Sequence, residues 1–336
     1  MQRRDLLKAV GTAGLLSGAV VASPLASQGE GAVLTPAQAG EAAGWPHWPF
    51  DEIHVPYQER AQRIRWPNGG PLCIYTYVTA EWSGSPQLPD PKARYTRDLR
   101  GESERSQYTY VVGIWRAMKL LDAFDIKTSI FANAGVVENY PELFRELHAK
   151  GHEIIMRTYD QGVPTTRFTP AEERSQIRRC TEIVQKVIGE RPVGFDNPGG
   201  VCTDQTPHLL AEEGYLWMGG LKGDDLPYAI KTRNGKSIIV VGSRHTTTND
   251  NAIFYSRGAR SGRDAFNYFR DVFDDYYKLG REEFPGAFNL GIHPNNSCIP
   301  DRIGFWYRAF EHMTQHKDVW FARCVDLAEY WKKHYV

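Results

Sequence analysis

The stretch Leu72-Cys73-Ile74-Tyr75-Thr76-Tyr77-Val78 decides the fold predicted for this chain of 336 residues. β-Branched and aromatic side chains follow one another there without polar alternation, which indicates a strand buried on both faces. Shorter apolar runs recur along the chain, and segments with apolar residues at helical spacing separate them. The further predicted strands are 128–132, 153–156, 193–195, 215–218, 238–241, 288–292 and 319–321, and the predicted helices are 111–124, 141–150, 169–188, 205–213, 262–279 and 301–316.

Alternating strands and helices predict parallel βαβ units, and therefore an α/β fold that is either a barrel or a doubly wound sheet. Glu81, Arg157, Asp196 and His293 each come shortly after a predicted strand. The carboxyl ends of parallel strands meet at one edge, where barrel enzymes place their chemistry. No linker or internal repeat interrupts the pattern, so we expect one domain over residues 70–336.

Residues 1–39 are typical of an export leader. Arg3-Arg4-Asp5-Leu6-Leu7-Lys8 resembles a twin-arginine signal, and an apolar run rich in small residues follows it. Ala37-Gln38-Ala39 has the form of a cleavage site, with Pro24-Leu25-Ala26 as an alternative. The apolar run is too short and too rich in Gly for a stable membrane span. We therefore expect a periplasmic or secreted protein, in which the Pro- and Trp-rich residues 40–69 form an extended lead-in.

The charge balance argues against nucleic acid as the main partner. Lys and Arg number 40, as do Asp and Glu, and no basic cluster stands out beyond the leader, whereas phosphate binding needs a concentrated basic face. The five cysteines are an odd number without CxxC spacing, so an oxidising compartment would allow one or two disulfides with no pairing predicted. They are Cys73, Cys180, Cys202, Cys298 and Cys324.

Six strings occur in a characteristic order over roughly residues 70–332. They are Val112-Gly113-Ile114-Trp115-Arg116; Asn139-Tyr140-Pro141-Glu142-Leu143 with Lys150-Gly151-His152-Glu153-Ile154; Arg191-Pro192-Val193-Gly194-Phe195; Asp224-Asp225-Leu226-Pro227-Tyr228; Asn249-Asp250; and Leu290-Gly291-Ile292-His293-Pro294, continuing to Asp318-Val319-Trp320-Phe321-Ala322-Arg323. Together they resemble the allantoinase-like branch of the polysaccharide deacetylases. The resemblance implies a distorted (β/α) barrel that hydrolyses a C–N bond, in an N-acetyl group or a cyclic amide. Relatives of this branch often assemble, so a homo-oligomer is compatible with it.

The chain departs from this family at the positions that bind a divalent metal such as zinc. Metal-dependent relatives have Asp-Asp after the first strand, where this chain has Thr79-Ala80-Glu81. They have two His four residues apart in the second motif, where Arg157 and Gln161 stand here. Arg cannot lose its proton to become a ligand, so we expect neither the usual metal site nor another cofactor. Asp196 occupies the place of an Arg in the third motif.

These exchanges suggest a site that works without a metal ion. Arg157 would place a fixed positive charge where the ion sits in relatives, and Asp196 would hold it by a bidentate pair. Glu81 would be the general base and His293 the general acid. One guanidinium supplies only part of a divalent charge, so we expect an activated substrate such as an imide or a cyclic ureide.

Further polar and aromatic residues in the loops are expected to contact the substrate. They are Trp82, Asp224, Asp225, His245, Asn249, Asp250 and Asn295. Two other residues allow catalytic interpretations that we consider weaker: His152 is better explained as a structural histidine, and Cys298 as a loop cysteine than as a nucleophile paired with His293.

Three classes of function remain open at this stage. The first is a cyclic amidase or imidase without a metal. The second is a metal-dependent carbohydrate N-deacetylase, which Arg157 and Gln161 disfavour. The third is a non-catalytic carbohydrate- or envelope-binding protein, in which Arg157 and Asp196 merely fill an inactive site. The high aromatic content of 12% is compatible with the third class, although most aromatic residues are expected in the core.

Overall fold

The computed structural model describes residues 48–81, 107–242 and 248–336. The chain divides into two units, Met1–Trp48 and Pro49–Val336, and every element described below belongs to the second. The expected leader, and Trp82 and His245 among the expected site residues, lie outside the described residues. None of the helices in the described ranges is both long enough and apolar enough to cross a membrane.

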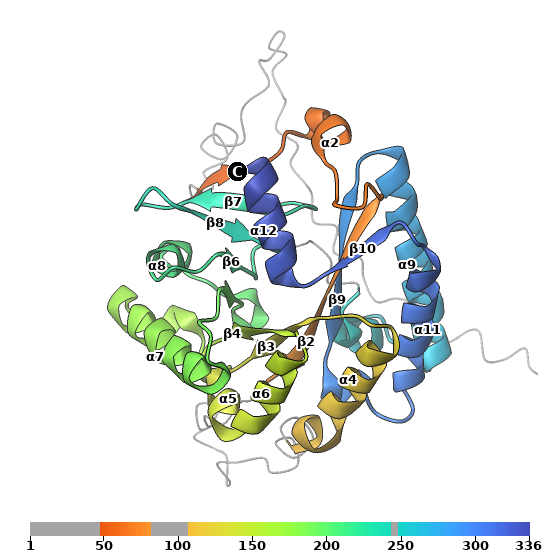
Figure 1. The fold of residues 1–336 in the computed structure, drawn as a ribbon, viewed down its shortest axis with the longest axis horizontal. Helices are drawn as coiled ribbons and strands as arrows, with labels where there is room; N and C mark the ends of the chain where they lie inside the picture. The colour runs from red at the N-terminus through yellow and green to blue at the C-terminus, as the bar shows by residue number, and fades with distance from the viewer. Residues whose placement is uncertain (1–47, 82–106, 243–247) are drawn as a thin grey trace, which may run out of the picture. The chain divides into compact units, whose positions relative to one another are not determined.

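Figure 1 shows one large sheet with most of the helices around its periphery. The strands are β1 (Asp51–Ile53), β2 (Leu72–Ala80), β3 (Ser129–Ala132), β4 (Glu153–Met156), β5 (Gly194–Phe195), β6 (Trp217–Met218), β7 (Tyr228–Lys231), β8 (Ser237–Val240), β9 (Gly286–Ile292) and β10 (Val319–Ala322). The helices are α2 (Tyr57–Arg63), α4 (Ile114–Ala123), α5 (Ala134–Asn139), α6 (Pro141–Ala149), α7 (Pro170–Ile188), α8 (Thr206–Glu212), α9 (Gly262–Glu282), α10 (Pro294–Ser297), α11 (Ile303–Gln315) and α12 (Cys324–Tyr335).

The parallel strands follow one another in the order β2, β3, β4, β5, β6 and β8. β2 pairs with three strands: β9 pairs along one of its edges, while β10 and β3 pair with successive parts of the other edge. The path is open between β8 and β9 except for an isolated parallel bridge that joins Asn249 to Gly291. The architecture is therefore a mixed α/β domain of the distorted barrel type, as predicted.

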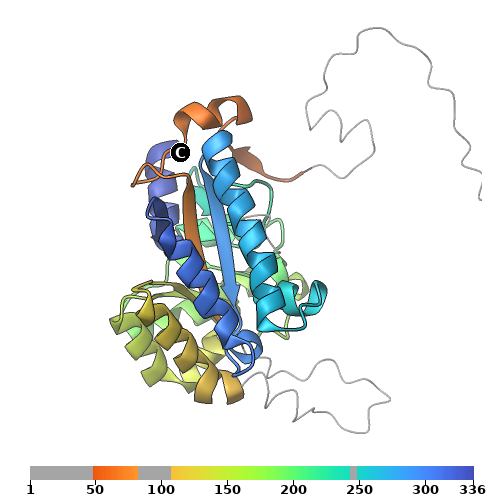
Figure 2. The ribbon, with the colours of Figure 1, turned by 90° about the vertical axis from the view of Figure 1, so that its right-hand side faces the viewer.

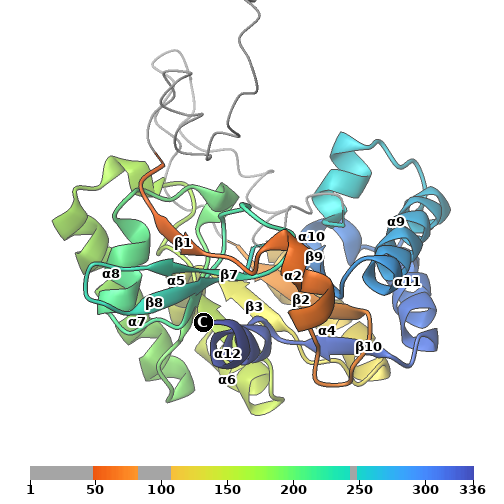
Figure 3. The ribbon, with the colours of Figure 1, turned by 90° about the horizontal axis from the view of Figure 1, so that it is seen from above.

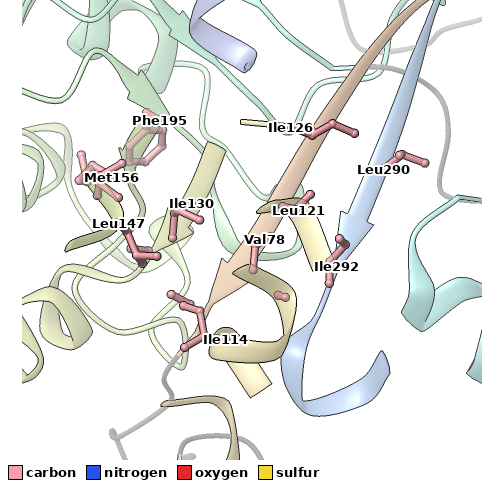
Figure 4. Packing of buried hydrophobic residues seen from close by; sticks show 14 of the residues in the cluster. Val78, Ile114, Leu121, Ile126, Ile130, Leu147, Met156, Phe195, Leu290 and Ile292 are labelled. Atoms are coloured by element: carbon pink, nitrogen blue, oxygen red, sulfur yellow. The ribbon is translucent and has the colours of Figure 1, made fainter. Parts of the chain in front are cut away.

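Strand residues alternate between two apolar layers, which explains why the β2 sequence is apolar on both faces. Leu72, Ile74 and Val78 point towards the surrounding helices and pack in one cluster. Figure 4 shows part of this layer, with side chains from β2, β3, β4, β5 and β9 against α4 and α6. Cys73 and Tyr75 belong instead to a second cluster at the centre of the barrel.

Helices surround the strands on several sides, as Figure 3 shows. α9 and α11 lie side by side next to β9, most clearly in Figure 2. α7 begins at a capping box between Thr169 and Glu172 and ends at Gly189 with a φ of 79°. Both ends were expected from the sequence, because Thr is a favoured N-cap and Gly accepts a positive φ.

α12 packs against β2, β8 and β10, and a buried carboxylate holds its first turn. One oxygen of Glu153 accepts hydrogen bonds from Ser129 Oγ at 2.5 Å and from the Val325 amide at 3.0 Å. The other oxygen accepts from Trp217 Nε1 at 2.9 Å. Burial raises the pKa of Glu153 to about 7, although all three donors favour the ionised form.

The described part of the lead-in, residues 48–69, differs from the extended segment expected for residues 40–69. β1 pairs antiparallel with β7, and α2 follows as a helix. β7 itself was not predicted; it forms a hairpin with β8 around Asn234-Gly235, a turn signal that the sequence does contain. The partner of β1 lies about 180 residues away, so local periodicity could not reveal this pairing.

Candidate active site

Four of the expected site residues meet at the carboxyl ends of the parallel strands. Glu81 follows β2, Arg157 follows β4 and Asp196 follows β5, while His293 follows β9. Charged contacts link the four in a row, from Asp196 to Arg157, from Arg157 to Glu81 and from Glu81 to His293. The barrel thus brings together side chains that are up to 212 positions apart in the sequence.

Arg157 lies between two carboxylates. Its Nη1 donates to Glu81 Oε1 at 2.5 Å, and its Nη2 lies 3.2 Å from Asp196 Oδ2. The expected bidentate pair with Asp196 is therefore wrong, because the two ends of the guanidinium serve different partners. Arg157 is only 5% exposed and stays charged, since burial lowers its pKa less than Glu81 and Asp196 raise it.

Glu81 is held as an anion. Burial on its own raises the pKa of the Glu81 carboxyl, but Arg157 and His293, together with a hydrogen bond from Gln161, outweigh it. The pKa of Glu81 therefore lies below its usual value. Tyr110 donates to the backbone carbonyl of Glu81 at 2.7 Å.

Asp196 has a different environment, although it touches the same guanidinium. Burial raises the pKa of Asp196 to about 6, opposed by the charge of Arg157 and assisted by that of Glu81. Its Oδ1 lies against Gly219, where an added Cβ would come within 2.4 Å of that oxygen. The two carboxylates beside Arg157 thus differ in their affinity for a proton.

Asp250 contacts both the imidazole and the backbone amide of His293. Its Nδ1 lies 2.6 Å from Asp250 Oδ1, and its backbone amide donates to Asp250 Oδ2 at 2.7 Å. Ser297 Oγ also donates to Asp250, and Trp306 Nε1 donates to Ser297 Oγ at 2.7 Å. Asp250 is fully buried, so it occupies a supporting position and not the substrate-facing one expected from the sequence.

The proton affinity of His293 follows from this support. Burial lowers the pKa of the imidazole, but the Asp250 carboxylate more than compensates, and the pKa of His293 is raised above its ordinary value. Its Nε2 points towards the site and lies 4.0 Å from Glu81 Oε1. A protonated imidazole beside a substrate can act as a general acid.

Tyr77 is a site residue that the sequence interpretation missed. Asn249 Nδ2 donates to Tyr77 Oη at 2.7 Å, and the charges of Asp196, Asp250 and Arg157 all act on this hydroxyl. An added Cβ at Gly291 would come within 2.4 Å of Tyr77 Oη. The alternation of β2 could have indicated that Tyr77 points to the centre, because Cys73 and Tyr75 do.

The remaining expected residues are less central. Asp224 is buried and accepts from Arg60 Nη2 at 2.6 Å and from the Leu226 amide at 3.1 Å, which fits bracing of the loop. Asp225 is exposed and Asn295 is half-buried. His152 is buried, which agrees with the structural role expected for it. It accepts a hydrogen bond from the Thr128 amide, and burial lowers its pKa to about 4.

The thiol of Cys298 does not suit nucleophilic chemistry. All five cysteines are free, and Cys298 is fully buried. Burial raises the pKa of the Cys298 thiol well above its ordinary value, so the reactive thiolate is disfavoured.

The residues at this site do not fit a bound metal ion. Within the described ranges, no three His, Cys, Asp or Glu side chains are grouped so that they could hold one. Arg157 and Gln161 approach Glu81 as donors, and a guanidinium supplies no lone pair to a metal. This donor set suits an anion or a polarised carbonyl better than a cation.

Comparison with known proteins supports the resemblance. Residues 108–217 match the family model described as polysaccharide deacetylase. The chain has a polysaccharide deacetylase domain. It is 21% identical to a peptidoglycan deacetylase of Helicobacter pylori over 261 residues, which are 69% of this chain and 88% of that protein.

Solved structures resemble a larger part of the chain than the family model matches. The Puue allantoinase structure has a TM-score of 0.73 and 28% identity, and the match covers 86% of this chain and 98% of that one. A probable polysaccharide deacetylase from Pseudomonas aeruginosa PAO1 has a TM-score of 0.71 and 25% identity, covering 83% of this chain and 95% of that one. The fold predicted from the sequence is therefore confirmed.

Proposed function

We propose that this protein hydrolyses a C–N bond of a cyclic amide, imide or ureide without a metal ion. The observation that carries the proposal is the guanidinium of Arg157, which is held between Glu81 and Asp196. The polysaccharide deacetylase domain and the likeness to an allantoinase support the type of bond.

The site contains groups suited to each step of amide hydrolysis. One of the two carboxylates beside Arg157 accepts a proton from water as the water oxygen attacks the carbonyl carbon. The electron pair of the C=O bond moves to oxygen, where Arg157 and the hydroxyl of Tyr77 stabilise the negative charge. Arg157 Nε is buried and has no hydrogen-bond partner among the described residues. His293 Nε2 then protonates the leaving nitrogen as the C–N bond breaks.

The proposed absence of a metal restricts the substrate. A single guanidinium carries half the charge of a divalent ion and cannot bind the attacking water as a ligand. The carbonyl must therefore be reactive already, as in a five- or six-membered imide or ureide ring. An unactivated acetamide is a poorer substrate for this arrangement.

The first experiment measures hydrolysis of succinimide, hydantoin and chitin oligosaccharides by the purified protein, together with its metal content. We expect ring opening of a cyclic compound at a rate that a chelator does not change. Turnover that a chelator abolishes and zinc restores would contradict the metal-free proposal.

A carbohydrate N-deacetylase is the second candidate, favoured by the family model and the Helicobacter pylori relative. Release of acetate from chitin oligosaccharides without ring-opening activity would support it. Binding to such oligosaccharides with no turnover of any compound would favour the non-catalytic alternative. Export through the twin-arginine pathway remains part of the proposal, and Arg3→Lys combined with Arg4→Lys should retain the protein in the cytoplasm if it is correct.

A further inference from the structure

Two carboxylates flank Arg157, and only one of them is needed to activate water. Glu81 was expected to be this base because it follows the first strand. The contacts of the two groups allow a choice between them, and this choice rests on the hydrolytic function proposed above.

Glu81 contacts three neighbouring side chains and holds them in position. It accepts the shorter contact from Arg157, at 2.5 Å, and a second hydrogen bond from Gln161. The imidazole of His293 faces the same oxygen at 4.0 Å. A carboxylate with two donors and a neighbouring imidazolium is strongly stabilised as an anion, so it is a weak base.

Asp196 has weaker restraints. Its contact with Arg157 is longer, at 3.2 Å, and involves only Oδ2. No other hydrogen bond to this carboxylate forms within the described part of the chain. The side chain of Asp196 is 14% exposed and that of Glu81 is 27% exposed, so water can approach either carboxylate and the hydrogen-bond contacts make the difference.

The charged and titratable groups around Asp196 explain why it binds a proton more readily than Glu81. They are Arg157, Glu81, Lys222, Tyr77 and Cys324. Burial and the negative charge of Glu81 raise the pKa of Asp196 to about 6, so it is mostly ionised at pH 7 yet accepts a proton readily. A general base is most effective when its pKa lies near the working pH.

We propose that Asp196 is the general base, and that Glu81 is a positioning residue that holds Arg157 and stabilises the protonated His293. Asp196 takes one proton from the attacking water, and His293 gives one to the leaving nitrogen. Release of the first proton to solvent and reprotonation of His293 restore the site, so no other reactant is required.

Gly219 provides a second test of the role of Asp196, because it lies next to the Oδ1 atom of that carboxylate. The position has no side chain, and an added Cβ would lie 2.4 Å from Asp196 Oδ1. Gly219→Ala should therefore displace the carboxylate while keeping its charge and its chemistry.

The experiment records kcat/KM against pH for the wild type, Asp196→Asn and Glu81→Gln, with the cyclic compound that the wild type opens. In the wild type, kcat/KM should rise with pH through about 6, as Asp196 ionises, and fall again as His293 loses its proton. Asp196→Asn should lose about 100-fold or more and lack the acid limb. Glu81→Gln should retain the acid limb and move the alkaline limb to lower pH, because His293 loses an anionic neighbour.

Chemical rescue separates the base from a structural role. Formate should restore part of the activity of Asp196→Ala, because it supplies a carboxylate in the vacated space, and should not restore Glu81→Ala. Asp271→Asn, which removes an exposed carboxylate, is the control for the loss of one acid. If Asp196→Asn fails to fold, Gly219→Ala gives the second test, and we expect a loss of at least about 10-fold.

The possible outcomes separate failure of the Asp196 assignment from failure of the proposed hydrolytic function. A wild type that opens none of the cyclic compounds would remove the proposed function and this assignment with it. An active wild type whose acid limb persists in Asp196→Asn, with formate rescue only of Glu81→Ala, would return the role of base to Glu81.

Discussion

At the scale of single residues, the support of His293 by Asp250 determines how the site responds to pH. The raised pKa of His293 means that its protonated form stabilises the folded state, fully so below about pH 6.5. This contribution to the free energy of unfolding is lost as the pH rises through the pKa of the folded state. The same support keeps a proton available for a leaving nitrogen at neutral pH.

Asp250→Asn should lower the pKa of His293, because the imidazolium loses its buried counter-charge. We expect a loss of about 100-fold in kcat/KM, and a destabilisation that is larger at pH 6 than at pH 9. NMR titration of the His293 ring reports the pKa without any substrate. Asp274→Asn, which removes the exposed partner of His312, is the control and should leave turnover unchanged. An unchanged titration of His293 in Asp250→Asn would remove Asp250 from this role.

At the scale of elements, the attachment of α12 depends on the carboxylate of Glu153 at the start of β4. The three donors to Glu153 come from β3, β6 and the start of α12. Because burial raises the pKa of Glu153 to about 7, the folded state prefers the protonated acid. The wild-type free energy of unfolding should therefore fall as the pH rises from about 4.5 to about 7.

Glu153→Ala should leave three buried donors without an acceptor and reduce stability by about 3 kcal/mol or more. Thr169→Ala, which removes the exposed cap of α7, is the comparison and should lose only about 1 kcal/mol. Urea denaturation between pH 5 and pH 8 measures both, and Glu153→Gln should show a weaker dependence on pH than the wild type. Equal losses for Glu153→Ala and Thr169→Ala would show that the buried network does not anchor the helix.

Prediction from the sequence succeeded where the signal is local. The parallel strands and the longer helices were placed from apolar spacing, and the ends of α7 from Thr169 and Gly189. The position of Glu81, Arg157, Asp196 and His293 at one edge followed from strand parallelism. The support from Asp250, which lies 43 positions before His293, depends on tertiary packing, so the sequence did not indicate it. The inward direction of Tyr77 was missed, although it follows from the alternation of side chains along β2.

At the scale of the whole molecule, the barrel closes where β9 meets the segment after β8. The bridge between Asn249 and Gly291 joins these parts, and Thr248 Oγ1 donates to the Asn289 carbonyl beside it. The same segment carries Asp250, so the contacts that close the barrel also position the imidazole of His293. Damage to the closure should therefore reach the site.

Gly291→Ala should disturb this closure, because its Cβ would lie 2.4 Å from Tyr77 Oη. We expect a destabilisation of about 1–3 kcal/mol and reduced turnover. Gly286→Ala in the same strand is a matched control, since its Cβ would meet only Leu72 Cδ1 at 3.4 Å. Thermal unfolding of both variants provides the measurement, and identical melting temperatures would count against the closure argument.

The lead-in has a consequence for proteolysis. His54 and Arg60 both reach Asp224, and these contacts cross about 170 positions of sequence. A protease that removed everything before residue 70 would take both cations away and leave Asp224, which is only 5% exposed, with the Leu226 amide as its remaining donor. We therefore expect a fragment that starts at residue 70 to be less stable than one that keeps residues 51–69.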